Sequence, residues 1–133
     1  MENMSQRHIL VVDDDQHILT LIASLLSRED YRVSGALDGE SAVSLLKQDK
    51  FDLIITDLIM PFMDGNALAR TVKSDPNLRD IPVILITANR DRNLLKTIFS
   101  SGSVFYLPKP FSSSSLRAIV RLALNNHLIH GTN

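Results

Sequence analysis

The sequence predicts a doubly wound α/β fold, in which five parallel strands in the order 2-1-3-4-5 carry helices on both faces of the sheet. Short apolar segments alternate along the chain with segments whose apolar residues recur at helical spacing. The strand-like segments are apolar at nearly every position, which is typical of strands that are covered on both faces. Right-handed crossovers between such strands give an open parallel sheet.

The first half of this pattern begins with an apolar strand expected at residues 8–12, which three acids, Asp13 to Asp15, bring to an end. From Gln16 the apolar period becomes helical, and Asp14 or Asp15 can cap this first helix. A weaker strand is expected at 31–37. Asp38, Gly39 and Glu40 then open the second helix.

The middle of the chain is expected to hold two further strands and the helix between them. Residues 52–57 form a β-branched apolar strand that ends in Asp57 and is followed by breakers at Pro61 and Asp64-Gly65. Asp64 can cap a helix that ends before Pro76. The next strand, 81–87, has Pro82 near its start, where a missing backbone donor costs least.

The last third supplies a helix, a strand and a final helix. Leu94, Leu95, Ile98 and Phe99 predict a helix stopped by Gly102, and the fifth strand is expected at 104–107. Ser112 to Ser115 then precede an amphipathic helical pattern, which favours a helix cap over a flexible linker. The inward face of this helix is expected to carry Leu116, Ile119, Val120, Ala123 and Leu124.

Length and composition fit one globular domain. The chain has 133 residues, of which 44% are hydrophobic and 22% charged, so a single core can form without disulfides. No internal repeat and no second block of composition marks another domain. We expect one domain over residues 1–133, with a core at about 7–125 and a polar tail at 126–133.

Composition also limits compartment and partners. The absence of cysteine excludes disulfides and thiolate metal sites, and a reducing cytoplasm is the expected compartment. A net charge of −1 gives no support to nucleic-acid or membrane-surface binding, which need a basic patch. The polar N-terminal residues 1–7 resemble no signal peptide, and no apolar run approaches the roughly 20 residues of a membrane span.

Four predicted strands end in residues whose side chains can react or bind ligands. Asp13 and Asp14 follow the first strand, Asp57 ends the third, Thr87 ends the fourth, and Lys109 lies just past the fifth. The carboxyl ends of parallel strands meet at one edge, and the strand order reverses between the first and third strands. We therefore expect these residues to form one site.

Three carboxylates gathered at one edge repel one another, by roughly 4 kcal/mol for two unit charges about 4 Å apart at an intermediate dielectric. Oxygen ligands without histidine or cysteine favour a hard cation, and Mg²⁺ usually takes one or two carboxylates. An acid nucleophile, Mg²⁺, an ammonium and a hydroxyl suit phosphoryl transfer. Asp57 would attack in line and form an acyl phosphate, with Lys109 and Thr87 contacting the phosphoryl oxygens.

The chain resembles a receiver domain of the response regulators of two-component signalling, of the chemotaxis-regulator type, over about residues 7–125. This resemblance also implies the flavodoxin-like fold described above. Each motif alone is weak, but all of them stand in the order and spacing of the family. The motifs are Val11-Val12-Asp13-Asp14-Asp15, Asp57-Leu58-Ile59-Met60-Pro61, Met63-Asp64-Gly65, Thr87-Ala88 and Tyr106-Leu107-Pro108-Lys109-Pro110-Phe111.

The resemblance implies that Asp57 accepts phosphate from a sensor histidine kinase or a phosphotransfer protein. Asp13, Asp14 and Asp57 would bind Mg²⁺ together with the backbone carbonyl of Ile59. The resemblance further implies a cis peptide bond between Lys109 and Pro110.

For signalling, the resemblance implies that Thr87 and Tyr106 act as a coupled switch. They would reshape the face made by the fourth helix, fifth strand and fifth helix for a downstream partner. No enzymatic activity is expected beyond self-catalysed phosphotransfer and autodephosphorylation.

Some residues depart from the family pattern. Pro108 removes a backbone donor from an edge strand. Ile59 and Asn89, each two positions after a site residue, flank the site in family members and tune the phosphate lifetime. Because an apolar Ile59 cannot orient an attacking water, we expect slow autodephosphorylation.

Two functions of other classes fit the sequence less well. A phosphatase with an aspartyl nucleophile usually needs an acid two residues later, where this chain has Ile59. A flavin- or nucleotide-binding module needs a phosphate-cradling loop after the first strand, where Asp13 to Asp15 would repel phosphate. A degenerate receiver that signals without phosphate is disfavoured because the acidic set is present. His127 and His130 have helical spacing, and without a third ligand they favour a solvated tail over a metal site.

The sequence leaves the kinase, the downstream target, the oligomeric state and the pathway open. It also leaves open whether the domain acts alone or is part of a larger regulator.

Overall fold

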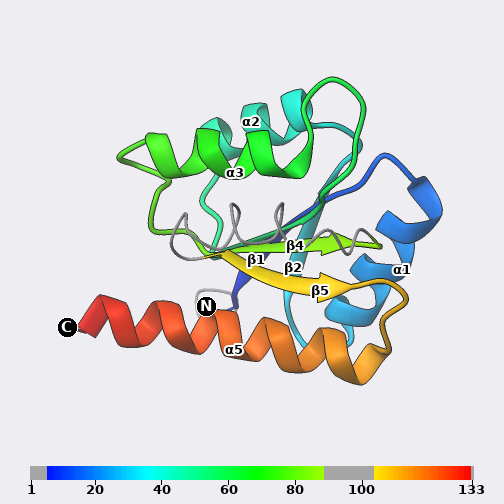
Figure 1. The fold of residues 1–133 in the computed structure, drawn as a ribbon. Helices are drawn as coiled ribbons and strands as arrows, with labels where there is room; N and C mark the ends of the chain where they lie inside the picture. Colours follow the sequence, from blue (N-terminus) through cyan, green and yellow to red (C-terminus); the bar gives the residue numbers. More distant parts are fainter. Residues whose placement is uncertain (1–5, 89–103, 133) are drawn as a thin grey trace.

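A computed structural model describes residues 6–88 and 104–132, with side chains described as far as residue 125. Five parallel strands form one sheet in the order β2-β1-β3-β4-β5, so the predicted fold class and strand order are confirmed. Figure 1 shows the sheet between two layers of helices. The strands are β1 (His8–Val12), β2 (Arg32–Ala36), β3 (Leu53–Asp57), β4 (Val83–Thr87) and β5 (Val104–Pro108).

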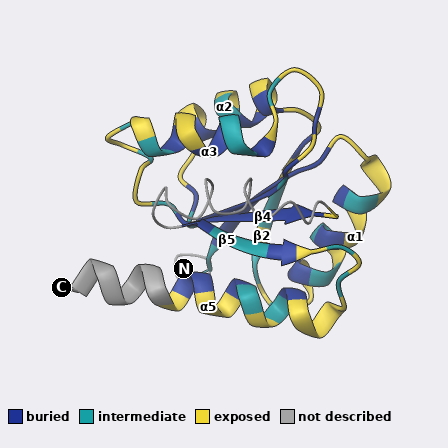
Figure 2. Cartoon of the chain, in the orientation of Figure 1, coloured by how far each residue is buried: buried dark blue, intermediate teal, exposed yellow. Residues whose placement is uncertain are grey.

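Helices α2 (Gly39–Gln48) and α3 (Gly65–Ser74) cover one face of the sheet, and α1 (Gln16–Ser27) and α5 (Ser113–Thr132) cover the other (Figure 1). Alternate strand residues point to opposite faces, so each strand contributes to both cores. In β3, for example, Ile54 packs in the α2–α3 layer and Ile55 packs in the α1–α5 layer. Burial on both faces is why β1, β3 and β4 are apolar at nearly every position, whereas the edge strand β2 is more exposed and includes Arg32, Ser34 and Gly35 (Figure 2).

Polar side chains fix the starts of the helices. The carboxylates of Asp15, Asp38 and Asp64 accept hydrogen bonds from the backbone N–H groups of His17, Ser41 and Ala67. Each bond satisfies a donor that the first helical turn leaves unpaired. Ser112 acts in the same way before α5, because its Oγ accepts a hydrogen bond from the Ser115 N–H at 3.0 Å. The predicted capping roles are thus confirmed.

The observed elements differ from the expected ones mainly at their ends. Strand β4 begins at Val83, directly after Pro82, and β2 is one residue shorter at each end than expected. Residues 126–132, expected as a polar tail, continue α5 to Thr132. The helix predicted from Leu94 to Phe99, its stop at Gly102 and the flanking Asn89 lie outside the described residues. Among the residues that the structure describes, no helix has the length and apolar character needed to cross a membrane.

Candidate functional site

The first and third strands bring the predicted acids together. In the β1–β3 pair, Val12 lies opposite Thr56, so Asp13 and Asp57 follow at adjacent positions of the same sheet edge. Carboxylate oxygens of Asp13, Asp14 and Asp57 all lie within 4.8 Å of one another. Asp13 is buried, Asp57 is partly buried and Asp14 is exposed. The predicted acidic cluster is therefore present and open to solvent on one side.

The side chain of Lys109, the residue after β5, extends to the carboxylates of this cluster. Its Nζ lies 3.2 Å from Asp57 Oδ2 and 3.9 Å from Asp13 Oδ2. The Lys109 backbone N–H donates to the Thr87 carbonyl at 3.0 Å, which places the residue just beyond the β4–β5 pair. The Lys109–Pro110 peptide bond is cis, as expected.

The surroundings of the buried Asp13 carboxyl change its pKa. Burial raises the pKa of Asp13 from its ordinary value, and the charge of Asp57 raises it further. The Asp15 N–H, which donates to Asp13 Oδ1 at 2.9 Å, and the Lys109 ammonium oppose this rise in the pKa. Burial thus disfavours the ionised form of Asp13, and a cation bound at the cluster would favour it.

The donor set fits a hard divalent cation. Three carboxylates supply only oxygen, and neither a cysteine nor a histidine contributes to the group. Such ligands suit Mg²⁺, which keeps water and phosphate oxygens as its remaining ligands. The residues present can thus hold the predicted metal at the acidic cluster.

Both carboxylate oxygens of Asp57 and its backbone carbonyl have hydrogen-bond partners. The Ile59 N–H donates to Asp57 Oδ1 at 3.2 Å, while Oδ2 faces Lys109. The Thr56 hydroxyl donates to the Asp57 carbonyl at 3.0 Å. Gly65 lies so close to that carbonyl that a Cβ there would overlap it. The carboxylate is consequently fixed in one orientation while it remains reachable from solvent.

Thr87 and Tyr106 lie on the two strands next to this group. Thr87 is buried and ends β4, while Tyr106 is half-buried on β5 and lies opposite Leu85. Paired residues of parallel strands point to the same face, and so do residues two apart along a strand. Thr87 and Tyr106 therefore share one face of the sheet, as a coupled pair requires.

The loop between β3 and α3 contains a feature that the sequence analysis did not single out. Phe62 has a φ of 68° and its side chain is fully exposed. The Met63 N–H donates to the Pro61 carbonyl at 2.8 Å, which closes a γ-turn centred on Phe62. A γ-turn with positive φ at its centre is rare, and a bulky residue in this region costs about 1 to 2 kcal/mol.

The neighbours of Phe62 explain how this conformation is maintained. Met60 is buried on one side, and Met63 packs on α2 at Gly39 on the other. The ring of Pro61 fixes its own φ, and Asp64 caps α3. With both flanks anchored inward, the residue between them points into solvent.

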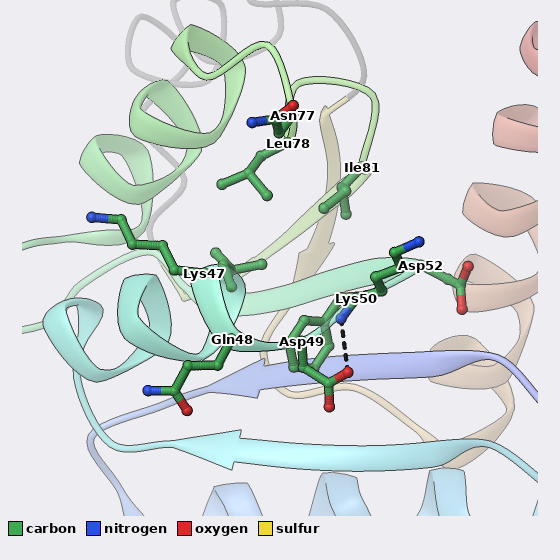
Figure 3. A pocket seen from close by; sticks show the side chains of 10 residues that line it. Lys47, Gln48, Asp49, Lys50, Asp52, Asn77, Leu78 and Ile81 are labelled. Atoms are coloured by element: carbon green, nitrogen blue, oxygen red, sulfur yellow. Dashed lines mark hydrogen bonds between the residues drawn. The ribbon is translucent and has the colours of Figure 1, made fainter.

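A surface depression lies at the opposite edge of the sheet from the acidic cluster, between the end of α2 and the loop before β4 (Figure 3). Its volume is about 840 Å³. Leu46, Phe51, Leu78 and Ile81 contribute apolar surface, and Lys47 and Lys50 contribute charge. None of the predicted site residues lines it, so the acidic cluster remains the candidate site.

The arrangement around Asp57 has the parts required for phosphoryl transfer. A partly buried carboxylate can attack, an ammonium beside it can neutralise phosphoryl oxygens, and a neighbouring group of acids can hold a divalent cation. An apolar residue occupies position 59, so the site lacks the general acid that an aspartyl phosphatase uses there.

The chain matches a known family of proteins. Residues 9–121 match the family model of the response regulator receiver domain. The chain is 42% identical over 118 residues to the response regulator PleD of Caulobacter vibrioides, covering 89% of this chain and 26% of that protein. It is 38% identical over 121 residues to the heme response regulator HssR of Staphylococcus aureus, covering 91% of this chain and 53% of that protein.

Solved structures show the same fold. The chemotaxis protein CheY4 of Vibrio cholerae superposes with a TM-score of 0.85 at 26% identity, covering 90% of this chain and 100% of that chain. The receiver domain of an HD domain-containing protein from Pseudomonas fluorescens gives a TM-score of 0.87 at 29% identity, covering 96% of this chain and 93% of that chain. The chain therefore spans whole receiver structures but only a quarter to about half of the two curated relatives above.

Proposed function

Because this chain belongs to the response regulator receiver domain family, we propose that Asp57 is the phosphoacceptor of a two-component phosphorelay. The observation that carries this proposal is the position of its carboxylate. Asp57 Oδ2 lies 3.2 Å from Lys109 Nζ, and its oxygens lie within 4.8 Å of those of Asp13 and Asp14. A nucleophile, a fixed cation and a metal-binding group thus share one sheet edge.

In the proposed reaction an Asp57 carboxylate oxygen attacks the phosphorus of a phosphohistidine on a sensor kinase or a phosphotransfer protein. The new O–P bond forms as the P–N bond breaks, and the leaving imidazole nitrogen takes a proton from solvent. The Ile59 N–H donates to Asp57 Oδ1, which leaves Oδ2 on the Lys109 side.

We infer that Asp13, Asp14 and Asp57 hold Mg²⁺ together with the Ile59 backbone carbonyl. The metal, when bound, neutralises charge on the transferring phosphoryl oxygens. Lys109 contributes a second positive charge beside Asp57, and the Thr87 hydroxyl lies at the end of the adjacent strand as a hydrogen-bond donor. Phosphorylation adds about −1.5 to −2 charges at the end of β3.

This added charge is proposed to act on a downstream partner through Thr87 and Tyr106. Thr87 moves toward the phosphoryl group, and the Tyr106 ring fills the space beside it, since both lie on one face of the sheet. The surface of β5 and α5, with the segment before β5, changes shape as a result. PleD and HssR are much longer than this chain, so output through a further domain and output through a separate partner are both compatible with the proposal.

Intact-mass measurement tests the phosphoacceptor role. The protein is incubated with Mg²⁺ and phosphoramidate, and the parent is expected to gain one phosphoryl group. Asp57→Asn should gain none, whereas the matched control Asp64→Asn, which alters an exposed acid at the start of α3, should react as the parent does. Omission of Mg²⁺ should abolish the reaction. Full labelling of Asp57→Asn would refute the assignment.

A further inference from the structure

The carboxyl edge of the sheet displays an unusual share of the exposed apolar surface. Among the described residues, five large apolar side chains are exposed, and three of them lie in loops at this edge. Phe62 is fully exposed, Ile59 is 60% exposed and Leu37 is 45% exposed. Met63 of the β3–α3 connection packs against Gly39, the first residue of α2. Ile59 and Phe62 therefore lie in the loop that directly follows Asp57 and borders the start of α2, and Leu37 precedes α2 at the same edge of the sheet.

Acidic residues share this edge of the sheet. Among the described residues, the exposed acids here are Asp14, Asp15, Asp38, Glu40 and Asp64, of which Asp14 belongs to the proposed metal-binding group. Lys109 lies at this edge as well, but it faces Asp57 and Asp13. A partner that covers the described part of the edge is therefore favoured by positive charge where it meets Asp15, Asp38, Glu40 and Asp64, and by apolar surface where it meets Phe62.

The backbone at Phe62 indicates that the ring has a use. Glycine adopts positive φ without strain, whereas a side chain at φ 68° is disfavoured. The ring contributes nothing to the core, since it is fully exposed. A residue that strains the loop and supports no packing points to a role in binding, and aromatic side chains, Phe included, are enriched in the cores of protein interfaces.

We propose that Phe62, in the same loop as Ile59, is the docking contact for the protein that carries the phosphohistidine. This donor presents an apolar recess within a positively charged rim. The inference rests on the proposed phosphoacceptor function, because any protein donor must approach Asp57 over this edge. A small-molecule phosphodonor needs no such contact. Comparing phosphorylation by a small-molecule donor with phosphorylation by a protein donor therefore distinguishes a loss of docking from a loss of phosphoryl transfer.

The test compares two donors on four proteins. Parent, Phe62→Gly, Phe62→Tyr and Leu122→Ala are phosphorylated by phosphoramidate with Mg²⁺, and separately by the autophosphorylated cores of the histidine kinases encoded in the same genome, assayed singly. Leu122 is a matched control, since it is an exposed apolar residue on α5. The fastest kinase is then used at acceptor concentrations far below saturation.

Phe62→Gly is expected to lose at least about tenfold in the kinase-dependent second-order rate while reacting with phosphoramidate within about twofold of the parent. Phe62→Tyr should restore the kinase rate, and Leu122→Ala should match the parent with both donors. The thermal midpoint of Phe62→Gly should equal or exceed that of the parent, because the strain at this position is relieved. The kinase-dependent rate of the parent should also fall as salt is added.

Three results would overturn the docking proposal. In the first, Phe62→Gly is phosphorylated by the kinase at the same rate as the parent. In the second, the phosphorylation rate of Phe62→Gly falls by the same factor with the kinase and with phosphoramidate. In the third, no kinase phosphorylates the parent faster than phosphoramidate does. Failure of the proposed function is a separate outcome, since the parent would then remain unlabelled by phosphoramidate as well.

Discussion

Lys109 Nζ lies 3.2 Å from Asp57 Oδ2, although the two residues are 52 positions apart in the sequence. The same ammonium is 3.9 Å from Asp13 Oδ2. It is partly shielded, with 26% of its side chain exposed, while the side chains of Asp57 and Asp13 are 12% and 2% exposed. One ammonium therefore compensates two carboxylates, which makes it a sensitive position for testing the site.

Replacing this ammonium should slow phosphorylation. In Lys109→Ala we expect the rate with phosphoramidate and Mg²⁺ to fall about 10- to 100-fold, because a preorganised charge beside the transferring phosphoryl group is lost. The rate is measured by intact mass at fixed times. Lys47→Ala, at an exposed position of α2 far from the acids, serves as the control and should react normally. Equal rates for Lys109→Ala and the parent would contradict a role for the ammonium.

The sequence could predict this grouping because parallel strands impose it. Strands β1, β3 and β4 are largely apolar along their length and have polar residues at or just after their ends, and all carboxyl ends meet at one edge. Asp13, Asp57 and Lys109 therefore converge whatever the detailed packing. The helix starts were predictable for a similar reason, since Asp15, Asp38 and Asp64 each stand where an N-cap is needed.

Other features depend on tertiary contacts that a linear pattern does not contain. The positive φ of Phe62 arises because Met60 is buried and Met63 packs on Gly39, and neither contact can be inferred from local propensity. The only signal available was an apolar aromatic residue in a loop between Pro61 and Met63. Likewise, the continuation of α5 to Thr132 was missed because polar residues beyond Asn125 resemble a tail.

Gly65 should be intolerant of a side chain. A Cβ at this position would overlap the Asp57 carbonyl oxygen and lie 2.9 Å from Leu58 Cα, and both are backbone atoms that cannot move independently. We expect Gly65→Ala to lower the free energy of unfolding by about 2 to 3 kcal/mol. The change is measured by urea denaturation monitored by circular dichroism.

Gly35→Ala is the matched control for this substitution. Its added Cβ would lie 3.1 to 3.3 Å from side-chain atoms of Leu19, a contact that a shift of a few tenths of an ångström in that side chain relieves. The loss for this variant should therefore stay below about 1 kcal/mol. If both variants lost the same stability, close backbone approach at Gly65 would not be the cause.

The Asp38 cap should make stability depend on pH. The Ser41 backbone N–H donates to its carboxylate, and this bond lowers the pKa of Asp38 from its ordinary value of 3.8. A carboxyl with a lowered pKa in the folded state contributes stability above its unfolded pKa, and this stability is lost as the pH falls through the folded pKa. Asp38→Asn should thus have a lower thermal midpoint than the parent at pH 7, with the difference closing below pH 3.8.

Thermal unfolding of both proteins from pH 7 to pH 3 measures this difference. Asn retains a side-chain oxygen that can cap the helix, so the comparison isolates the charge. Asp38→Ala removes the cap as well, and it should be less stable than Asp38→Asn throughout the range. A difference between parent and Asp38→Asn that did not change with pH would exclude the ionised carboxylate as its source.

The lifetime of the phosphorylated form should depend on Ile59. This residue is 60% exposed beside Asp57, and its N–H holds Asp57 Oδ1 at 3.2 Å. Its side chain offers no donor or acceptor to a water attacking the acyl phosphate. Ile59→Asn supplies an amide at the same place and keeps the backbone N–H, so we expect the acyl phosphate to decay several-fold faster.

Decay is followed by intact mass after the phosphodonor has been removed, with Mg²⁺ present throughout. Ile59→Val is the matched control, because it remains apolar and should decay at the rate of the parent. An Asn variant that decayed no faster would show that water reaches the phosphoryl group without help from residue 59.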